Sequence, residues 1–287
     1  MIGYKWFDTE GFFWRHHFKS LLPLSMPHID PRLSHNKAQQ LVRDRGVWFL
    51  RWETEFDSNK PSDWWHVIKD EPEDTDALSA NTRSKVRRGN KKYTVTPIDT
   101  LKIKSDFYSI YLQTFASYST IEKPANYQTF KTAIDGLPKE TEFWCISEID
   151  SGKIVGFSEN LMRDNACFYL SIWIIPLAKQ KYAGYALFYN MNKHYLNEMG
   201  CQYVSDGARS ISHDTNVHEF LETKFNFRKA YSTLNIEYAQ WFGMLVKVMY
   251  PVRKIIGKLP TATIKKISII LFQEEIKRSH QKKSNNK

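Results

Sequence analysis

The stretch FYLSIWIIPLAKQKYAGYALFYNMNKHYLNEMG, from Phe168 to Gly200, decides the fold. It opens as an apolar, β-branched run, stops at Pro176, passes through a short basic turn and continues with the character of a helix. The first amides of a helix have no partner within it, and together with the helix dipole they bind anions. We therefore expect a buried strand followed by a helix over Tyr185–Met199 whose first turn holds an anion.

Regular strand and helix patterns continue on both sides of this stretch. Asp150-Ser151-Gly152-Lys153 is a strong hairpin turn, and cap residues open the last helix. From Tyr93 onward the predicted order is β-α-α-β-β-β-α-β-α-β. The expected strands are Tyr93–Ile98, Thr141–Ile149, Lys153–Met162, Ala166–Ile175, Cys201–Gly207 and Arg228–Tyr238, and the expected helices are Ile103–Ser117, Tyr127–Ile134, Tyr185–Met199 and His213–Phe225.

The segments before and after this region have a different character. Strand-like runs occur at Gly46–Phe56 and Asp63–Asp70, and a basic helix candidate at Ser79–Lys92. The sequence therefore predicts an N-terminal extension with strands and a basic helix (1–92), an α/β domain (93–238) and a basic amphipathic tail (239–287). The polar end of the tail, from Ser279, is expected to be disordered.

Composition indicates a globular protein. Apolar residues make up 42% of the 287 residues and aromatic residues 15%, which is ample for a core. The cysteines, Cys145, Cys167 and Cys201, are scattered and form no metal-binding spacing with histidines, so we expect reduced thiols, a reducing compartment and no metal. The N-terminus lacks the apolar core of a secretory signal, and no window approaches the ~20 apolar residues of a membrane-spanning helix. These features predict a cytoplasmic protein.

The net charge of +10 is concentrated in the tail. Ala239–Lys287 contains 11 lysines and arginines and 2 acids, whereas the rest of the chain contains 30 and 29. Apolar residues of the tail form one helical stripe with lysines beside it, and Pro251 should break the helix. This pattern predicts peripheral contact with an anionic membrane through 241–272, or packing against the domain or a second subunit. The stripe consists of Trp241, Met244, Leu245, Val248, Met249, Val252, Ile255 and Ile256.

The element order and two motifs resemble the acyl-CoA N-acyltransferase superfamily of the GNAT type. That superfamily begins the helix after its central strand with Gln/Arg-x-x-Gly-x-Gly/Ala, and this chain has Lys181-Tyr182-Ala183-Gly184-Tyr185-Ala186, with lysine at the first position. HEFLETKFNFRKAY (218–231) is similar to the superfamily's last helix and strand, with Phe220 for a tyrosine and Asn226 for a glycine. The resemblance covers roughly Tyr93–Tyr238. It implies an α/β (α+β) fold with a mixed, largely antiparallel sheet flanked by helices.

A looser resemblance is to the bacterial Fem-type peptidoglycan aminoacyl transferases. They also carry a basic helix, here LSANTRSKVRRGNKKYTV (78–95), just before the first strand of the domain, and YVSDGARSISHDTN (203–216) is similar to their sequences. Fem-type proteins normally contain two such domains, and residues 1–92 are too few for a complete first copy.

The GNAT resemblance implies that the anion is the diphosphate of acetyl-CoA or another acyl-CoA, bound as a co-substrate. Gly184 and its neighbours would offer backbone amides, Lys181 would add a point charge, and Ala186 would keep the next turn slim. The strand before the turn would separate from the next strand, and the amide of Ile174 would polarise the thioester carbonyl. The expected coenzyme-binding residues are Ile174, Lys181, Tyr182, Ala183, Gly184, Tyr185 and Ala186.

The acceptor amine must lose a proton, so a carboxylate or histidine near the separated strands is expected to act as base. Glu159, Asp206 and His213 are candidates, and Tyr231 is the candidate acid for the leaving thiolate. Each also has a structural interpretation: an exposed strand residue for Glu159, a turn residue for Asp206, a solvated loop residue for His213 and a core residue for Tyr231.

The basic helix suggests an anionic acceptor. Arg83 and Arg87 share one helix face, and Arg209 could hold an anionic part of the acceptor, although a solvated basic helix has the same pattern. We expect transfer of an acyl group to an amine, such as an amino sugar of a cell-surface polysaccharide or peptidoglycan precursor, free or lipid-linked. One alternative is that the donor is an aminoacyl-tRNA, which is the one nucleic acid we would then expect the protein to bind. The other is a non-catalytic, membrane-tethered binding module. The oligomeric state is left open.

Overall fold

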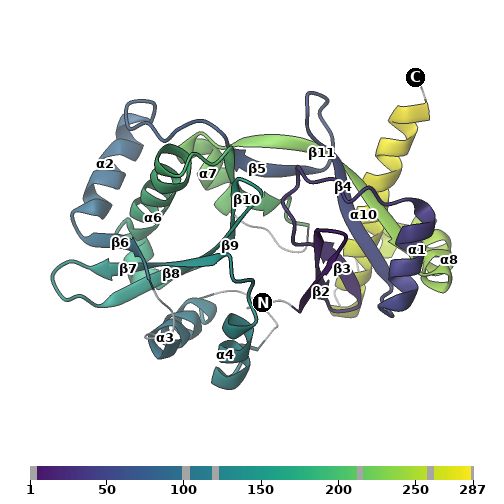
Figure 1. The fold of residues 1–287 in the computed structure, drawn as a ribbon, viewed down its shortest axis with the longest axis horizontal. Coiled ribbons are helices and arrows are strands. Elements are labelled where there is room, and N and C mark those ends of the chain that lie inside the picture. Colours follow the sequence, from purple (N-terminus) through teal and green to yellow (C-terminus); the bar gives the residue numbers. More distant parts are fainter. Residues whose placement is uncertain (1–4, 99–103, 118–122, 212–215, 257–261, 286–287) are drawn as a thin grey trace. The chain divides into compact units, whose positions relative to one another are not determined.

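The computed structural model describes residues 5–98, 104–117, 123–211, 216–256 and 262–285. These residues form two compact units (Figure 1). Unit 1 contains Val67–Gly207 and Val217–Arg228, and unit 2 contains Lys5–His66, Ala208–Asn216 and Lys229–Lys287. The division is interleaved, and so it differs from the linear division into extension, domain and tail that the sequence predicts.

Unit 1 is built on a mixed, mostly antiparallel sheet, as expected. Its strand order is β5-β10-β9-β8-β7-β6. Neighbours from β6 to β9 pair antiparallel, and β9 pairs parallel with β10. The strands are β5 (Trp65–Lys69), β6 (Tyr93–Pro97), β7 (Thr141–Glu148), β8 (Ile154–Arg163), β9 (Ala166–Ile174) and β10 (Tyr203–Ala208).

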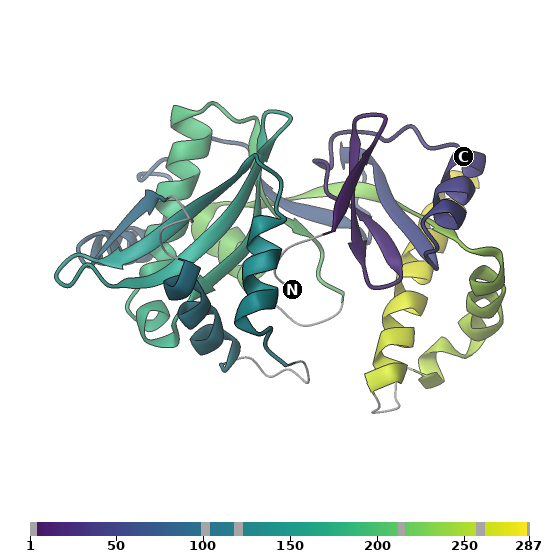
Figure 2. The same ribbon diagram turned by 60° about the horizontal axis from the view of Figure 1, so that its bottom comes forward.

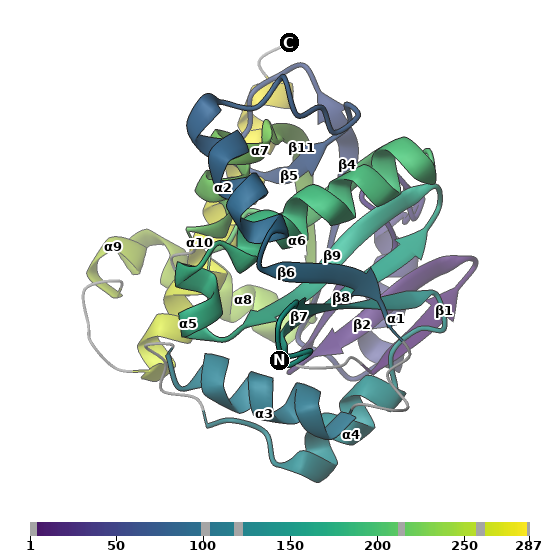
Figure 3. The ribbon, with the colours of Figure 1, turned by 90° about the vertical axis from the view of Figure 1, so that its left-hand side faces the viewer.

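Helices cover both faces of this sheet (Figure 3). Helices α3 (Lys104–Phe115) and α4 (Tyr127–Asp135) lie on one face, where Phe107 stacks on Phe157 with ring centroids 4.2 Å apart. Helices α2 (Ala80–Asn90) and α6 (Ala183–Asn192) lie on the other face. Helix α6 continues into a π-helical turn, Lys193–Glu198, and α7 spans Val217–Phe225.

The predicted strand-turn-helix stretch is confirmed, with two differences. Helix α6 begins at Ala183, two residues earlier than expected, and a short helix, α5 (Pro176–Gln180), precedes it. Pro176 occupies the first turn of α5, where a proline is favourable because its ring presets a helical φ. Proline thus ends the strand and starts a helical turn at the same point.

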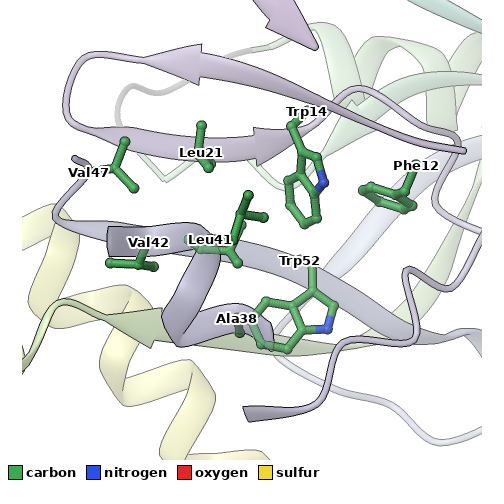
Figure 4. Close-up of a cluster of buried hydrophobic side chains, with 9 residues drawn as sticks. Phe12, Trp14, Leu21, Ala38, Leu41, Val42, Val47 and Trp52 are labelled. Carbon is green, nitrogen blue, oxygen red and sulfur yellow. The ribbon is translucent and has the colours of Figure 1, made fainter. Parts of the chain in front are cut away.

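Unit 2 has its own core, and its described residues contain five further strands. The strand order is β1-β2-β3-β4-β11. Ser34 caps the N-terminus of α1 (His35–Asp44), where its side chain accepts a hydrogen bond from the amide of Lys37. Leu41, Trp14 and Trp52 belong to the buried cluster that α1 forms with the sheet (Figure 4). The strands are β1 (Trp6–Thr9), β2 (Phe12–His17), β3 (Ser20–Pro23), β4 (Phe49–Ser58) and β11 (Arg228–Tyr238).

Strand β11 explains why the division is interleaved. It was expected to be the last strand of the domain 93–238, but it pairs antiparallel with β4, for example Leu234 with Glu53 and Ile236 with Arg51. Backbone hydrogen bonds between segments about 180 residues apart in sequence therefore place β11 in unit 2.

The tail is helical and belongs to unit 2. It forms α8 (Gln240–Met249), a 3₁₀ turn (Tyr250–Val252), α9 (Arg253–Ile256) and α10 (Ala262–Asn285), and α8 packs beside α10 (Figure 2). The predicted helix break at Pro251 is confirmed. The predicted disorder from Ser279 is not, because α10 continues to Asn285.

Candidate active site

The first turn of α6 has two amides without partners. Tyr182 precedes the helix in a left-handed conformation, with φ of 73°. Its carbonyl accepts the amides of Tyr185 and Ala186 at 3.1 and 3.2 Å. Among the described residues, nothing accepts a hydrogen bond from the amides of Ala183 and Gly184. This is the positive end of a helix, and it can bind an anion.

Gly184 leaves that end of the helix uncovered. A Cβ built at Gly184 would meet only Ile174 Cδ1, at 3.8 Å, which is an ordinary van der Waals distance. The close approach of backbones occurs instead at Gly89 of α2, where a Cβ would lie 2.7 Å from the Tyr182 carbonyl oxygen and 3.1 Å from Ala186 Cβ. Ala186 is therefore small because α2 packs against it.

The contact through Gly89 brings basic side chains of α2 to the start of α6. Lys85 Nζ lies 3.4 Å from Tyr185 Oη and 5.3 Å from the centre of its ring. Arg88 Nη1 lies 3.4 Å from Tyr182 Oη. With the exposed Lys181, these groups add positive charge to the segment that begins α6. Lys85 and Arg88 were not singled out from the sequence, because the helix pattern alone does not show which basic residues face α6.

The two arginines predicted on α2 have different surroundings. Arg83 Nη1 donates to the carbonyl oxygens of Asp76 and Leu78, at 3.1 and 2.8 Å, so it fixes the turn before α2. Arg87 is exposed. A role for either in substrate binding stays a prediction.

Strand β9 leaves its parallel neighbour soon after the two begin to pair. The pairing with β10 runs from Ala166 opposite Tyr203 to Phe168 opposite Ser205. Strand β9 then continues to Ile174 while pairing only with β8 on its other side. The predicted separation of the two strands is therefore present, and it lies directly before the turn that leads to α6.

A β-bulge at Leu170 sets the direction of the side chains in this part of β9. Ser171 lies opposite Glu159 and Tyr169 lies opposite Asn160, so one extra residue is accommodated between the two pairs. The bulge sends Tyr169 and Ser171 to opposite faces of the sheet. Tyr169 donates to Asn192 at 2.8 Å, on the α6 side.

Glu159 is a buried acid on the opposite face of the sheet, beside the part of β9 that does not pair with β10. Its side chain is 2% exposed, and its Oε1 atom is buried with no hydrogen-bond partner. Burial raises the pKa of Glu159 to about 7, against the opposing effect of a hydrogen bond from Ser171. Ser171 is itself positioned by Trp173, whose Nε1 donates to Ser171 Oγ at 3.1 Å. A carboxyl group that titrates near neutral pH and has a free oxygen can act as a general base.

A second acidic group lies at the end of β10. Asp206 and His218, from the first turn of α7, approach to 3.3 Å between Oδ2 and Nε2. Burial raises the pKa of Asp206, while the hydrogen bond and charge of His218 oppose this rise. Sequence reasoning missed His218 and proposed His213 instead, which lies outside the described residues. Two histidines flank the same cap residues in the sequence, and the contact with Asp206 that the structure describes is that of His218.

The remaining predicted residues, Tyr231 and Arg209, belong to unit 2. Tyr231 packs edge-on against Trp65, with ring centroids 6.5 Å apart. Arg209 donates to the carbonyl oxygen of Asp63 at 2.8 Å and lies 4.5 Å above the Trp65 ring. Both have packing partners within unit 2, whereas Glu159, Asp206 and the α6 turn belong to unit 1.

The described residues contain neither a candidate metal site nor a helix that could span a membrane. In the part of the chain that the structure describes, no group of three or more histidines, cysteines, aspartates or glutamates could hold a metal ion. None of the described helices is long and apolar enough to cross a membrane. Cys145, Cys167 and Cys201 are buried free thiols.

Comparison with known proteins gives structural matches only. No family model matches the sequence, and no curated protein matches it. Among solved structures, FemX is similar with a TM-score of 0.59 and 10% identity over 85% of this chain and 91% of its own. L-PGS from Bacillus licheniformis is similar with a TM-score of 0.52 and 11% identity over 88% of this chain and 89% of its own. At these identities the likeness concerns the fold, and the chain therefore has the GNAT-like fold of the Fem-type proteins.

Proposed function

We propose that the protein transfers an acyl group, most simply acetyl, from acyl-CoA to an amine. The observation that carries this proposal is the path of β9, which leaves β10 after Phe168 and leads into a helix with two free amides. A separated strand can bind an extended chain through its backbone, and the helix start can bind a diphosphate. Pantetheine and diphosphate are joined in this order in coenzyme A.

The basic groups near the helix start suit the donor. Lys85, Arg88 and Lys181 add positive charge around the amides of Ala183 and Gly184. The open space above Gly184 lets a phosphate approach the backbone. Lysines contribute as point charges, so most of the directed hydrogen bonding would come from the amides.

Glu159 is the base in this proposal. Burial raises its pKa to about 7, so it can take up a proton near neutral pH. The amine nitrogen attacks the thioester carbonyl carbon, the new C–N bond forms, and the C–S bond breaks. Because Glu159 is buried, the proton of the amine passes to it through water, and the thiolate takes a proton from solvent. General-base assistance of this kind contributes on the order of 10²–10⁴ in rate.

The acceptor follows from the sequence resemblance rather than from a contact. An amino sugar of a cell-surface polysaccharide or peptidoglycan precursor supplies a primary amine together with phosphate charge. Such an acceptor also suits the basic character of α2.

A second candidate is transfer of an aminoacyl group from charged tRNA. It is favoured by the match to FemX, which covers 85% of this chain and therefore includes residues of both units. Fem-type proteins, the group that the sequence resembles, are aminoacyl transferases. Here the basic helix α2 would face RNA phosphates instead of a coenzyme.

The two donors can be separated by one assay. Purified protein is incubated with amino-sugar acceptors and either acetyl-CoA, with release of free thiol followed by a thiol-reactive dye, or tRNA carrying a radiolabelled amino acid. We expect acceptor-dependent thiol release with acetyl-CoA. Transfer of label from tRNA without thiol release would replace the proposal with the second candidate. If neither thiol release nor transfer of label is observed, a binding module without catalysis is favoured.

A further inference from the structure

We propose that unit 2 docks on an anionic lipid surface through an exposed apolar face of the tail helices. We call this face the α8–α9 stripe. The proposal is independent of the transferase reaction, since it concerns residues outside unit 1. The stripe consists of Trp241, Met244, Leu245, Val248, Val252 and Ile255.

The stripe is apolar surface that the core of unit 2 does not use. Val248 is 75% exposed, Ile255 68% and Met244 64%, which are high values for large apolar side chains. The opposite side of α8 is buried, with Phe242 and Val246 packed in the core of unit 2. Met249 and Ile256, which the sequence placed on the stripe, also pack against that core. Because α8 is apolar on both sides, one side fills the core and the other needs a different apolar environment.

The stripe runs past the helix break and is held in a fixed orientation. Val252 and Ile255 continue the exposed face beyond Pro251. Arg253 binds Glu275 of α10, with Nη2 2.8 Å from Oε1. Arg278 of α10 lies 3.8 Å from the centre of the Tyr250 ring. These contacts tie the tail helices to one another while leaving the stripe outward.

Two aromatic residues extend the stripe. Trp48, 40% exposed, meets Trp241 edge-on with ring centroids 5.6 Å apart. Its amide donates to the carbonyl oxygen of Lys19 at 2.7 Å, which places Trp48 beside the turn that carries Phe18, itself 65% exposed. Tryptophan is enriched at membrane interfaces, where its ring is buried and its N–H stays solvated.

The charges around the stripe select a lipid surface over a second copy of the chain. Lys247 and Lys254 are exposed beside the stripe, and Lys266 lies 5.3 Å from the ring of Phe18. No aspartate or glutamate occurs from Gln240 to Ile256. A two-fold dimer through the stripe would bring together two copies of this segment, which carries lysines and no acid of its own. Anionic headgroups supply the missing charge.

The test is co-sedimentation of the full chain with vesicles of phosphatidylcholine, alone or mixed with phosphatidylglycerol. We expect strong binding to the mixed vesicles and weak binding to phosphatidylcholine alone. Met244→Asp with Val248→Asp should weaken binding to mixed vesicles at least tenfold, and both sites are exposed, so folding should be retained. The matched control is Ile149→Asp, an exposed apolar residue of unit 1, which should leave vesicle binding unchanged.

A second variant tests the charge. Lys247→Gln with Lys254→Gln should weaken binding to mixed vesicles by about 30-fold and leave the weak binding to phosphatidylcholine as it is. Light scattering gives the oligomeric state of each protein. A wild-type dimer that ignores vesicles and becomes a monomer in the Met244→Asp, Val248→Asp variant would overturn the proposal, and so would equal vesicle binding by that variant and the wild type.

Discussion

Glu159 and Ser171 lie opposite one another on β8 and β9, beside a bulge that turns Ser171 toward Glu159. This pair brings a buried carboxyl group to the part of β9 that no longer pairs with β10. Ser171 supports the ionised form of Glu159 by a hydrogen bond, while burial favours the protonated form. The balance leaves an acid whose pKa, about 7, suits proton transfer at neutral pH.

Replacing Glu159 should remove most of the activity without preventing donor binding. For Glu159→Gln we expect kcat to fall on the order of 10²–10⁴-fold, because the variant has no group to take the amine proton. Binding of acetyl-CoA should change little, since the helix start is untouched. Steady-state kinetics and calorimetry measure the two effects. Ser171→Ala is the matched control: it keeps the base but removes a donor that lowers its pKa, so the midpoint of the pH–kcat profile should move upward. A Glu159→Gln protein with wild-type kcat would exclude Glu159 as the base.

The raised pKa of Glu159 also predicts how stability depends on pH. An acid whose pKa is higher in the folded than in the unfolded state stabilises the fold fully at low pH, and this contribution is lost as pH rises through the folded value. A rise from 4.5 to about 7 corresponds to roughly 3 kcal/mol. The Glu159→Gln side chain cannot ionise, so the variant loses no stability as the pH rises. It should therefore be as stable as the wild type near about pH 4 and more stable by roughly 3 kcal/mol near about pH 8. Urea denaturation at both pH values measures this difference, and a constant difference between the two proteins would contradict it.

The contact between Gly89 and α6 should tolerate no side chain. Gly89→Ala puts a methyl group 2.7 Å from a backbone oxygen, so we expect a loss of about 1–3 kcal/mol of stability from overpacking. Gly184→Ala is the control, because the added methyl group meets only one side-chain atom at a normal distance. It should be neutral or stabilising by up to about 1 kcal/mol, since alanine restricts the unfolded chain. Thermal denaturation of the two variants compares them directly, and equal stability would show that α2 can move away from α6 at no cost.

The pair of Asp206 and His218 can be tested by titration. His218 opposes the rise that burial causes in the pKa of Asp206, so His218→Ala should raise that pKa further. Carbon-13 NMR of the Asp206 carboxyl group gives the value. Glu219→Ala, at an exposed position of the same helical turn, should leave the Asp206 titration unchanged. An unchanged pKa for Asp206 in the His218→Ala variant would mean that the two side chains do not interact in solution.

The sequence predicts most of unit 1 because its elements follow local patterns. The hairpin at Asp150–Lys153, the strand before Pro176 and the helix after it all depend on residues close in sequence. The bulge at Leu170 has no local signal: Tyr169 and Ser171 would share one face in a regular strand, and only the register with β8 separates them. Glu159 was named as a candidate, but its burial depends on α3 and α4 packing over that face.

Unit 2 was much harder to predict. Its strand order depends on β11 pairing with β4, and nothing near either strand indicates a partner about 180 residues away. Local patterns therefore predict a linear division of the chain, with Tyr231 and Arg209 inside the domain 93–238. In the structure both residues pack on Trp65 in unit 2. His218 also lacks a distinguishing local signal, since the sequence before it carries a second histidine, His213, with equal claim from sequence.

The most direct test of the account is calorimetric titration of coenzyme A into three proteins: the wild type, Gly184→Ala and Gly184→Pro. Proline is accepted in the first turn of a helix but has no amide hydrogen, whereas alanine keeps it. We predict saturable binding to the wild type and to Gly184→Ala, and binding at least about tenfold weaker to Gly184→Pro, the cost of one hydrogen bond to a charged group. Wild-type protein that does not bind coenzyme A, or a Gly184→Pro variant that binds as tightly as Gly184→Ala, would contradict it.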